Sequence, residues 1–445
     1  MADASLGVAG QRPRTAARTG SGATWDARRL LSAALLAAPL AIVVLVGVVT
    51  QRPALSGVTG DLRVYFDDSA RLIGGAVPYR GFSLEYPPLA LLPMTLPRLV
   101  WPFGAPDEDT YQWLFGAMEG ALAVAVGWLL VRASGEPVRT AALWVALVLA
   151  SAASVTWRYD LWPAAAVLIA VLAADRGRPA LAGVAIGTGT MLKLFPIVVL
   201  PILVARAIAL HDRRGLGRLV AGTVGAIAVV LGGAFALAGT DSFGWLRYEL
   251  DRGLQLESTG SGALLLLHVV ADLPYRIVRD FGTLQVDATG AGLVAAGSTV
   301  VEVILVAGVA GLAYLRFRSD ERRTGTVARE SLVAATVAIL VGLIVASKVF
   351  SVQYIVWFLP LVPFLPARMR LLALAVTGLS TLIYPLNYFA LWHLDPVLAV
   401  ALNIRNLLLV ALFAWLAVLL RPDRSDRTVA ALATGRPSGP ARSSG

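Results

Sequence analysis

Long apolar runs separated by short polar breaks dominate the pattern of this chain. A helix of about 20 apolar residues spans the hydrocarbon core of a bilayer, and the runs predict about twelve such helices. The first covers 30–50, and the others cover approximately 110–132, 138–155, 161–174, 179–192, 194–210, 217–239, 291–315, 330–347, 353–367, 370–390 and 396–420. The pattern therefore predicts an all-α polytopic membrane protein.

Three segments fall outside this pattern. The stretch 87–103 contains five prolines, which remove too many backbone donors for a regular spanning helix, so we expect a bent, shallow segment at the outer face. Residues 1–28 and 421–445 are rich in small and polar residues without periodicity, which predicts two disordered cytoplasmic tails. The membrane-embedded domain is then 29–420.

The longest charged and aromatic stretch, 61–88, follows the first apolar run. If 61–74 is helical, one face carries Leu62, Tyr65, Phe66, Ser69, Leu72 and Ile73, and we expect that face on the membrane interface. Arg63, Asp67 and Arg71 then form a solvated ladder on the opposite face. Asp61 and Asp68 lie at the border between the faces, and Asp61 is either an N-cap or a functional acid.

Composition and charge agree with a membrane protein. The chain is 57% hydrophobic and 15% charged, with a mean hydropathy of +0.73. Its net charge of +10 comes from arginines spread over loops and tails, which argues against a nucleic-acid partner. Counted by the positive-inside rule, the arginine-rich loops are cytoplasmic, and 61–88, 157–163, 240–290, 347–354 and 387–396 lie outside. We expect interfacial helices in the first and the 240–290 outer loops.

Several kinds of site are excluded by the residues available. The chain has no cysteine, so it has no disulfide, no thiol nucleophile and no cysteine metal site. Its three histidines, His211, His268 and His393, have no metal-ligand spacing. No nucleotide-binding motif occurs, and Gly187 and Gly189 are better explained by close helix packing. We expect neither a metal nor a cofactor.

Lysine is the most informative residue type. Only Lys193 and Lys348 are lysines among 38 basic residues, and both lie at the outer ends of apolar helices. A charge there is costly, so each lysine either has a function or snorkels to the interface. Since an ammonium group suits a phosphate oxygen, two of them beside lipid indicate a lipid-linked phosphate.

Other charged residues permit two interpretations each. Arg158 and Asp160 lie in a short outer turn, where they either neutralise each other or serve a site. Arg252 and Glu257 lie in a polar outer loop that is either solvated or functional. Within the spans, Glu119, Glu302 and Arg405 are best explained by structural pairing inside the bundle.

Four blocks of sequence, in this order, resemble glycosyltransferase family 87. They are DLRVYFDDSARLIGGAVPYRGFSLEYPPLALL, RYDLWPAAAVLIAVLAADRGRPALAGVAIGTGTMLKLFPIVVLP, DRGLQLES and SKVFSVQYIVWFLPL, spread over about 61–365. One departure is Val352, where the family often has proline. The resemblance implies a GT-C type fold and inverting transfer of a sugar, mannose or alternatively arabinofuranose, from a polyprenyl phosphate to a lipid or glycan hydroxyl on the extracytoplasmic face of the cell membrane.

The resemblance also implies roles for particular residues. An acid in the first outer loop acts as base in that fold, and Asp61 is the matching position. Lys193, Lys348 and Arg158 are then candidates for the donor phosphate. The candidates for sugar or acceptor contacts are Asp68, Glu85, Tyr86, Asp160, Arg252, Glu257 and Gln353. Two other classes fit the composition, a twelve-helix secondary transporter and a flippase or scaffold, but no related halves are visible in the chain.

Overall fold

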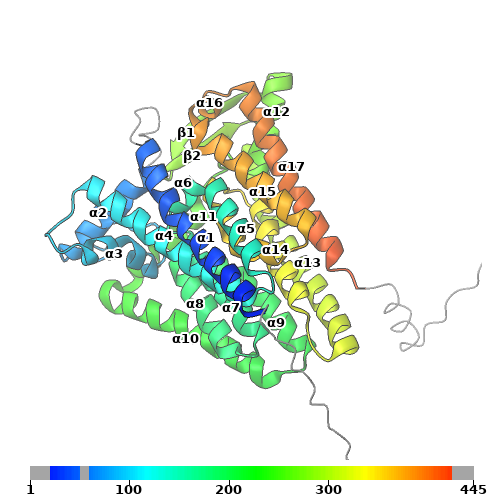
Figure 1. Cartoon of the computed structure of the whole chain (residues 1–445). Coiled ribbons are helices and arrows are strands. Elements are labelled where there is room, and N and C mark those ends of the chain that lie inside the picture. The colour runs from blue at the N-terminus through cyan, green and yellow to red at the C-terminus, as the bar shows by residue number, and fades with distance from the viewer. Residues whose placement is uncertain (1–20, 51–59, 423–445) are drawn as a thin grey trace, which may run out of the picture.

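Helices built from the apolar runs form most of the protein, whose computed structural model describes residues 21–50 and 60–422 (Figure 1). The first half contains α1 (Ser21–Thr50), α2 (Gly60–Ile73), η2 (Pro88–Ala90), α3 (Leu91–Val100), α4 (Glu108–Ala133), α5 (Pro137–Ala150), α6 (Ala152–Thr156), α7 (Leu161–Asp175), α8 (Pro179–Leu192), η3 (Phe195–Val199), α9 (Leu200–Ala209) and α10 (Arg213–Ala238). The second half contains η4 (Gly239–Phe243), α11 (Gly244–Asp251), α12 (Thr259–Ala271), β1 (Tyr275–Asp280), β2 (Thr283–Ala288), α13 (Ala291–Thr324), α14 (Arg329–Ala346), η5 (Val352–Trp357), η6 (Leu359–Phe364), α15 (Ala367–Thr381), η7 (Leu382–Leu386), α16 (Tyr388–Trp392) and α17 (Pro396–Leu419).

Within the described residues, six helical stretches are long and apolar enough to cross a membrane. They are α4, Arg213–Asp251, α13, α14, Ala367–Leu386 and α17. This confirms a largely helical membrane protein. The other predicted runs correspond to shorter apolar helices, so the count of about twelve spans stays a prediction.

Proline accounts for two of the shortened runs. The predicted helix 194–210 begins with the tight turn η3, which contains Pro196, before α9. The predicted helix 353–367 is replaced by η5 and η6, and Pro360 and Pro363 lie in η6. Since proline has no N–H to donate, neither stretch forms a continuous α-helix from end to end.

The first helix begins earlier than its apolar run predicts. We expected a start at residue 30, but α1 already begins at Ser21. The tails predicted to be disordered, 1–28 and 421–445, lie for the most part outside the described residues. Residues 21–28 belong to α1, and for the rest of the two tails disorder stays a prediction.

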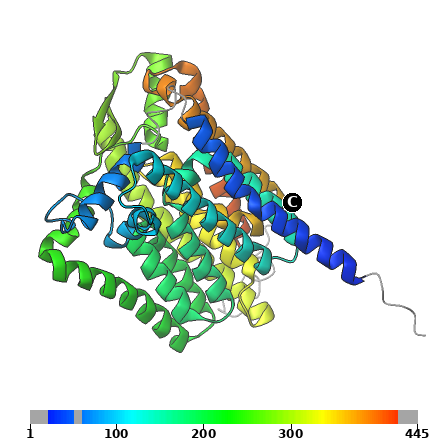
Figure 2. The same ribbon diagram turned by 60° about the vertical axis from the view of Figure 1, so that its left-hand side comes forward.

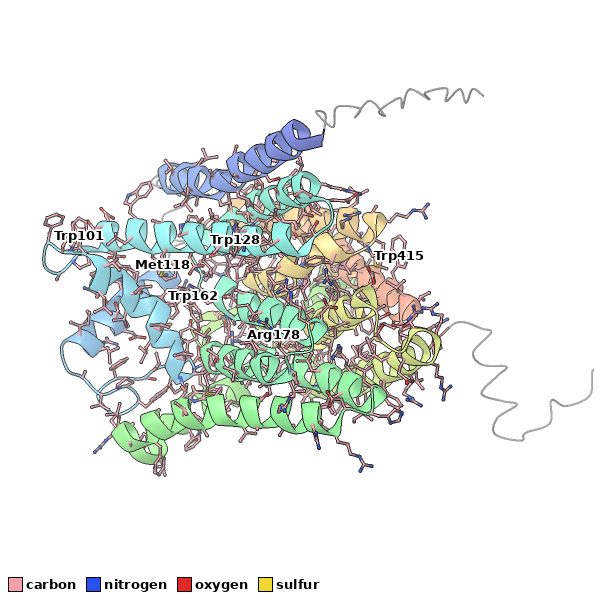
Figure 3. All side chains as sticks on the ribbon, turned by 60° about the horizontal axis from the view of Figure 1, so that its bottom comes forward. Trp101, Met118, Trp128, Trp162, Arg178 and Trp415 are labelled. Carbon is pink, nitrogen blue, oxygen red and sulfur yellow. The ribbon has the colours of Figure 1, made fainter. Side chains whose placement is uncertain are left out.

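Burial separates a central helix from peripheral ones. Nearly every side chain of α14 is buried, as expected for a helix that is apolar on all sides. In contrast, α10 and α13 expose most of their apolar residues along the edge of the bundle. Trp128 of α4 and Trp415 of α17 also lie on outer faces (Figure 3). These exposed apolar surfaces fit contact with lipid.

Loops that we predicted on the cytoplasmic side meet at one end of the bundle. Arg329, at the start of α14, forms an ion pair of 2.6 Å with Asp175 and donates a hydrogen bond of 2.7 Å to the carbonyl of Ala133. Arg318 of α13 similarly donates to the carbonyl of Ala209 at 3.1 Å. The ends of α4, α7, α9 and α13 are thus joined by arginines, away from the candidate site residues.

Helix α2 confirms the predicted helix 61–74 but not its predicted surroundings. Leu62 and Tyr65 are at most 1% exposed and pack with α4 and the turn at 157–159, so the first part of this face contacts protein, whereas Ile73 at its end is 53% exposed. Arg71 pairs with Asp68 at 3.2 Å, so it is not part of a ladder with Asp67. The buried face fixes the start of α2 against the body of the bundle.

A β-hairpin in the 240–290 loop is the element that the apolar pattern did not predict. Strands β1 and β2 are antiparallel, and the hairpin stands out from one end of the bundle near α16 (Figure 2). The N–H of Leu256 donates to the carbonyl of Leu284 at 3.0 Å, and that of Val286 to the carbonyl of Leu254 at 2.9 Å. The loop before α12 therefore continues the sheet, and the expectation of an all-α chain is wrong at this point.

Close packing of α8 on α10 depends on glycine, as predicted for Gly187. A Cβ on Gly187 would lie 2.5 Å from the carbonyl oxygen of Thr223, and one on Gly189 would lie 3.0 Å from Ala166 of α7. A Cβ on Gly183 would collide with the carbonyl oxygen of Leu219. Small residues at these positions allow the backbones to approach.

Replacing Gly183 with alanine is expected to lower the free energy of unfolding by about 1–3 kcal/mol, because the new methyl group forces α8 away from α10. The control is Gly225→Ala on α10, where nothing lies within 4 Å of the added group. A gain of about 0.5–1 kcal/mol is expected there. Equilibrium unfolding in mixed micelles measures both, and an unchanged Gly183→Ala protein would contradict the packing argument.

Candidate active site

A cavity of about 580 Å³ lies at the end of the bundle that carries the hairpin. Among the predicted site residues, those that line it are Asp61, Glu85, Tyr86, Arg158, Lys193, Arg252, Glu257 and Gln353. Asp160 lies directly behind this lining, whereas Asp68 and Lys348 are not part of it. The structure thus brings together most of the residues selected from separate blocks of the sequence.

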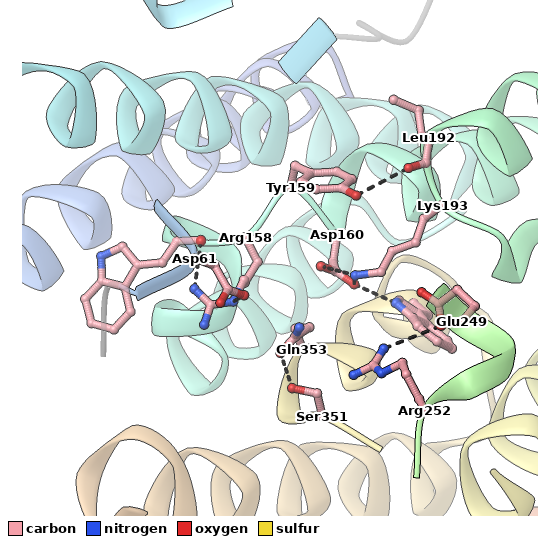
Figure 4. A network of polar contacts seen from close by, with 12 residues as sticks. Asp61, Arg158, Tyr159, Asp160, Leu192, Lys193, Glu249, Arg252, Ser351 and Gln353 are labelled. Carbon is pink, nitrogen blue, oxygen red and sulfur yellow. Dashed lines mark hydrogen bonds and ion pairs between the residues drawn. The ribbon is translucent and has the colours of Figure 1, made fainter. Parts of the chain in front are cut away.

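Asp61 and Arg158 form an ion pair at one side of the cavity (Figure 4). Asp61 lies in the first turn of α2, which begins at Gly60, and its Oδ2 is 2.6 Å from Nε of Arg158. The side chain of Arg158 is 8% exposed and that of Asp61 is 33% exposed. Instead of acting only as a cap, the Asp61 carboxylate is held at the cavity surface by a buried guanidinium.

Lys193 binds Asp160, two residues after Arg158 in the same turn (Figure 4). Its Nζ donates to the two carboxylate oxygens at 2.8 and 2.9 Å. Trp357 donates its Nε1–H to Oδ1 of Asp160 at 2.7 Å. Since an ammonium group has three N–H donors and Asp160 takes two, one remains for a ligand. Because Asp160 binds Lys193 and Trp357, it is not the partner of Arg158, although the two residues are close in sequence. Arg158 pairs with Asp61 instead.

The loop 252–258 supplies the opposite wall, and Lys348 holds it in place. The carbonyl of Lys348 accepts from the N–H of Gln255 at 3.0 Å, and its Nζ donates to the carbonyl of Leu250 at 2.9 Å. Within the loop region, Arg252 contacts Glu249 at 3.5 Å. Lys348 thus supports residues that line the cavity, but it is not itself part of the lining. The lining therefore gives no support to the predicted contact between Lys348 and the donor phosphate.

Glu257, which lines the cavity, forms a buried pair with Arg405, which does not. Nη1 of Arg405 lies 3.7 Å from Oε2 of Glu257, and Nη2 donates to the Glu257 carbonyl at 2.8 Å. Burial raises the pKa of Glu257 to about 7, although the charge of Arg405 opposes that shift. The predicted structural pairing of Arg405 is confirmed, and its partner is a candidate site residue.

Glu85 and Tyr86 come from the segment between α2 and η2. Tyr86 packs edge-on against Tyr65 and Tyr159, with ring centroids 6.0 and 5.6 Å apart. Burial raises the pKa of Glu85 above its ordinary value. Asp68 is not part of the cavity lining and pairs with Arg71. Neither Asp67 nor Asp68 lines the cavity, so the lining does not support the predicted sugar or acceptor contact of Asp68.

Several lining residues were not predicted, and they come from the hairpin and the region before α17. Tyr384 accepts a hydrogen bond of 3.1 Å from Nη2 of Arg158, and Tyr388 packs edge-on against Tyr384. Arg279 of β1 lies 5.5 Å from the ring centroid of Trp392. Because these residues lie in a short strand and around a helix break, no charge pattern or period marked them.

The lining contains equal numbers of acids and bases: Asp61, Glu85, Glu249 and Glu257 against Arg158, Lys193, Arg252 and Arg279. Such a surface can bind a polyhydroxylated ligand that carries an anionic group. Within the described residues, no group of three or more histidine, aspartate or glutamate side chains is arranged to hold a metal ion. An exposed carboxylate beside cations is suited to accept a proton while neighbouring groups stabilise negative charge.

Comparison with known protein families gives a match. A family model described as Glycosyltransferase family 87 matches residues 84–342, which is more than half of the chain. No curated protein matches the chain. The matched region includes Arg158, Lys193 and Glu257, and Asp61 lies before it.

Proposed function

The chain belongs to glycosyltransferase family 87, and on that premise we propose that it transfers a sugar, mannose in the first instance, from a polyprenyl phosphate to a hydroxyl of a lipid or glycan. The observation that carries the proposal is the Asp61–Arg158 ion pair on a cavity that also contains Lys193. These groups fit a reaction in which one oxygen loses a proton and another gains charge.

The proposal includes a topology of the GT-C type. About twelve spans, with both termini cytoplasmic and the cavity on the extracytoplasmic face of the cell membrane, agree with the positive-inside rule. The grouping of Arg318 and Arg329 contacts at the end away from the cavity supports this arrangement. A donor carried on a membrane lipid can reach a cavity at the extracytoplasmic end of the bundle. The proposed reaction therefore needs no soluble nucleotide sugar as its donor.

In the proposed reaction, Asp61 takes the proton of the acceptor hydroxyl as the oxygen attacks the anomeric carbon. The bond from that carbon to the phosphate oxygen breaks, and its electron pair leaves with the polyprenyl phosphate. One displacement inverts the anomeric configuration, whereas a retaining route would need a second carboxylate as nucleophile. Arg158 fixes the direction of the Asp61 carboxylate through the ion pair of 2.6 Å.

Cations of the lining stabilise the leaving phosphate, whose charge increases as the bond breaks. We assign this role to Lys193 and to the remaining donors of Arg158, and we leave out Lys348 because it lies outside the lining. A phosphate that carries a single lipid chain needs no metal in this scheme. Glu85, Tyr86, Arg252 and Gln353 line the cavity, and we assign them to contacts with the sugar or the acceptor, with Asp160 behind Lys193.

The competing membrane classes are less well supported. Membership of a glycosyltransferase family argues against a secondary transporter and against a scaffold without catalytic function. A transporter also places its coupling residues near the bilayer midplane. Here the predicted charged residues gather around one cavity at the end of the bundle.

Donor choice tests the proposed function directly. Membranes containing the protein are expected to transfer labelled mannose from polyprenyl-phosphate-mannose to extracted envelope lipids, above the background of membranes without the protein. No transfer is expected from a nucleotide-linked mannose once polyprenyl phosphate has been removed, because no nucleotide-binding motif occurs.

A parallel reaction with polyprenyl-phosphate-arabinofuranose distinguishes the two sugars. If only that donor is active, the transferred sugar is arabinofuranose and not mannose, and the proposal of a polyprenyl-phosphate donor still holds. Equal activity with the nucleotide sugar would contradict a lipid-linked donor, and silence with all donors would contradict the proposed transfer.

A further inference from the structure

Four cations of the described residues line the cavity, and three of them have an acidic partner within ion-pair distance. These pairs are Arg158 with Asp61 at 2.6 Å, Lys193 with Asp160 at 2.8 Å and Arg252 with Glu249 at 3.5 Å. The fourth cation is Arg279 of β1, and no carboxylate of the described residues lies within that distance of it. Its charge is therefore available to an anionic ligand.

Arg279 lies on the face of the hairpin that packs onto the bundle. Alternate residues of a strand share a face, so Arg279 is on the same face as Tyr275 and Ile277. Tyr275 is buried, and Ile277 packs against an apolar cluster that includes residues of α12 and α17. The opposite face carries Arg276, which pairs with Asp287 across the hairpin at 2.9 Å, with both side chains exposed. The arginine on the outer face thus has an acidic partner, whereas the arginine on the inner face has none among the described residues.

Contacts of the hairpin fix the position of Arg279 at the rim of the cavity. At the tip of the hairpin, the hydroxyl of Tyr248 donates to the carbonyl of Phe281 at 2.6 Å. The guanidinium of Arg279 lies 5.5 Å from the ring centroid of Trp392, and both side chains are exposed as well as part of the lining. They therefore lie where the cavity opens. A guanidinium held beside an aromatic ring keeps its N–H groups free for an anion.

The rim beside Arg279 is apolar. Leu386, Phe389 and Trp392, in η7 and α16, are exposed and belong to the cavity lining. Exposed apolar side chains next to a free cation fit a ligand in which an anionic head group is attached to an apolar chain. Phosphate suits an arginine in particular, because the guanidinium can donate two parallel hydrogen bonds to its oxygens.

We propose that Arg279 binds the phosphate of a lipid substrate at the rim of the cavity, where Leu386, Phe389 and Trp392 contact the beginning of its apolar chain. The inference rests on the proposed function, in which the phosphate belongs either to the polyprenyl donor or to the head group of an acceptor lipid. Arg279 is exposed, whereas Arg158 and Lys193 are mostly buried beside their carboxylates. Its role is to hold the substrate and not to stabilise the breaking bond.

Steady-state kinetics of Arg279→Gln tests the inference, with polyprenyl-phosphate-mannose as donor and envelope lipids separated by anion exchange as acceptors. We expect the KM of one substrate to rise by about 10-fold with little change in kcat, because a hydrogen bond to a charged group is lost away from the reacting atoms. A higher KM for the donor assigns the phosphate to the polyprenyl phosphate. A higher KM for the anionic acceptor fraction, with the neutral fraction unaffected, assigns it to the acceptor lipid.

Ionic strength adds a second readout. Between about 0.05 and 0.5 M salt, the same KM is expected to rise in the wild type and to change less in Arg279→Gln, because salt screens an exposed pair of charges. Arg279→Lys keeps the charge but loses the planar group that binds phosphate through two hydrogen bonds, so we expect an intermediate KM. This variant provides a second measurement should the glutamine variant fold poorly.

The matched control is Arg276→Gln, on the same strand. Arg276 points to the outer face of the hairpin and is not part of the cavity lining, so its KM values are expected to equal those of the wild type. Unchanged KM values in a folded Arg279→Gln protein, or an equal rise in both variants, would overturn the role of Arg279 while leaving the proposed transfer intact. An inactive wild type would overturn the proposed function, and this inference with it.

Discussion

Replacing Asp61 with asparagine is expected to lower the turnover number by about 10²- to 10⁴-fold, the usual contribution of a positioned general base. The asparagine side chain keeps the shape of aspartate but cannot accept a proton at neutral pH. Asp61 contacts Arg158 on the cavity surface, and its side chain remains one-third exposed, so it can reach a bound acceptor. Transfer of labelled mannose at equal protein abundance measures the effect.

Asp67→Asn is the control for that experiment. Asp67 lies on the same helix, α2, but it is not part of the cavity lining. It should retain wild-type turnover. Because Asp61→Asn also removes the carboxylate partner of the buried Arg158, size-exclusion chromatography and thermal unfolding must show that both variants are folded. A folded Asp61→Asn protein with wild-type turnover would remove Asp61 from the mechanism.

Replacing Lys193 with methionine should lower the free energy of unfolding by about 3–5 kcal/mol, the cost of leaving one member of a buried ion pair without its partner. The Asp160 side chain is fully buried, and Lys193 supplies two of its hydrogen bonds. Only the Trp357 indole remains to satisfy that carboxylate among the contacts described above. Equilibrium unfolding in mixed micelles provides the measurement.

Lys348→Met is the matched control, since Lys348 is the only other lysine of the chain and its ammonium donates to a backbone carbonyl. An effect of at most about 1 kcal/mol is expected there. The double variant Lys193→Met with Asp160→Asn should lose less of the free energy of unfolding than Lys193→Met alone, because it has no buried carboxylate without a partner. Equal losses in the two lysine variants would show that the Asp160 pair contributes little to stability.

The helices could be predicted where a run of apolar residues is uninterrupted. The run 161–174 became α7, Leu161–Asp175, and the run 330–347 became α14, Arg329–Ala346. Where prolines lie inside a run, as in η6, the hydropathy remained high while the hydrogen-bonding pattern changed. Hydropathy reports the environment of a segment, so it could not predict these breaks.

The hairpin illustrates a different limit. Its strands are only six residues each, and they lie in a polar loop between helices. The sequence did contain a signal, because a glycine, Gly282, lies between two stretches with alternating apolar residues. In the structure Gly282 forms the turn with a positive φ of 63°. A pattern of this length is too short to be separated from a loop without knowledge of its neighbours.

The candidate site was predictable in composition but not in pairing. The cost of a charge beside an apolar helix selected Lys193, and the family resemblance added Asp61 and Arg158; all three line the cavity. Neither argument could show that Arg158 pairs across the fold with Asp61, nor that Lys348 supports a loop instead of a ligand. Tyr384 and Tyr388 are uncharged, so the same rule did not select them.

The hairpin that closes one side of the cavity also determines which part of this protein is easiest to redesign. It is attached to the loop at 254–256 through backbone N–H and C=O groups, whose hydrogen bonds do not depend on side-chain identity. Phe281 and Thr283, at its tip, line the cavity. A library of variants at these two positions would change the shape of the binding surface while preserving the attachment, so a single hairpin offers a route to new donor and acceptor preferences on an unchanged membrane scaffold.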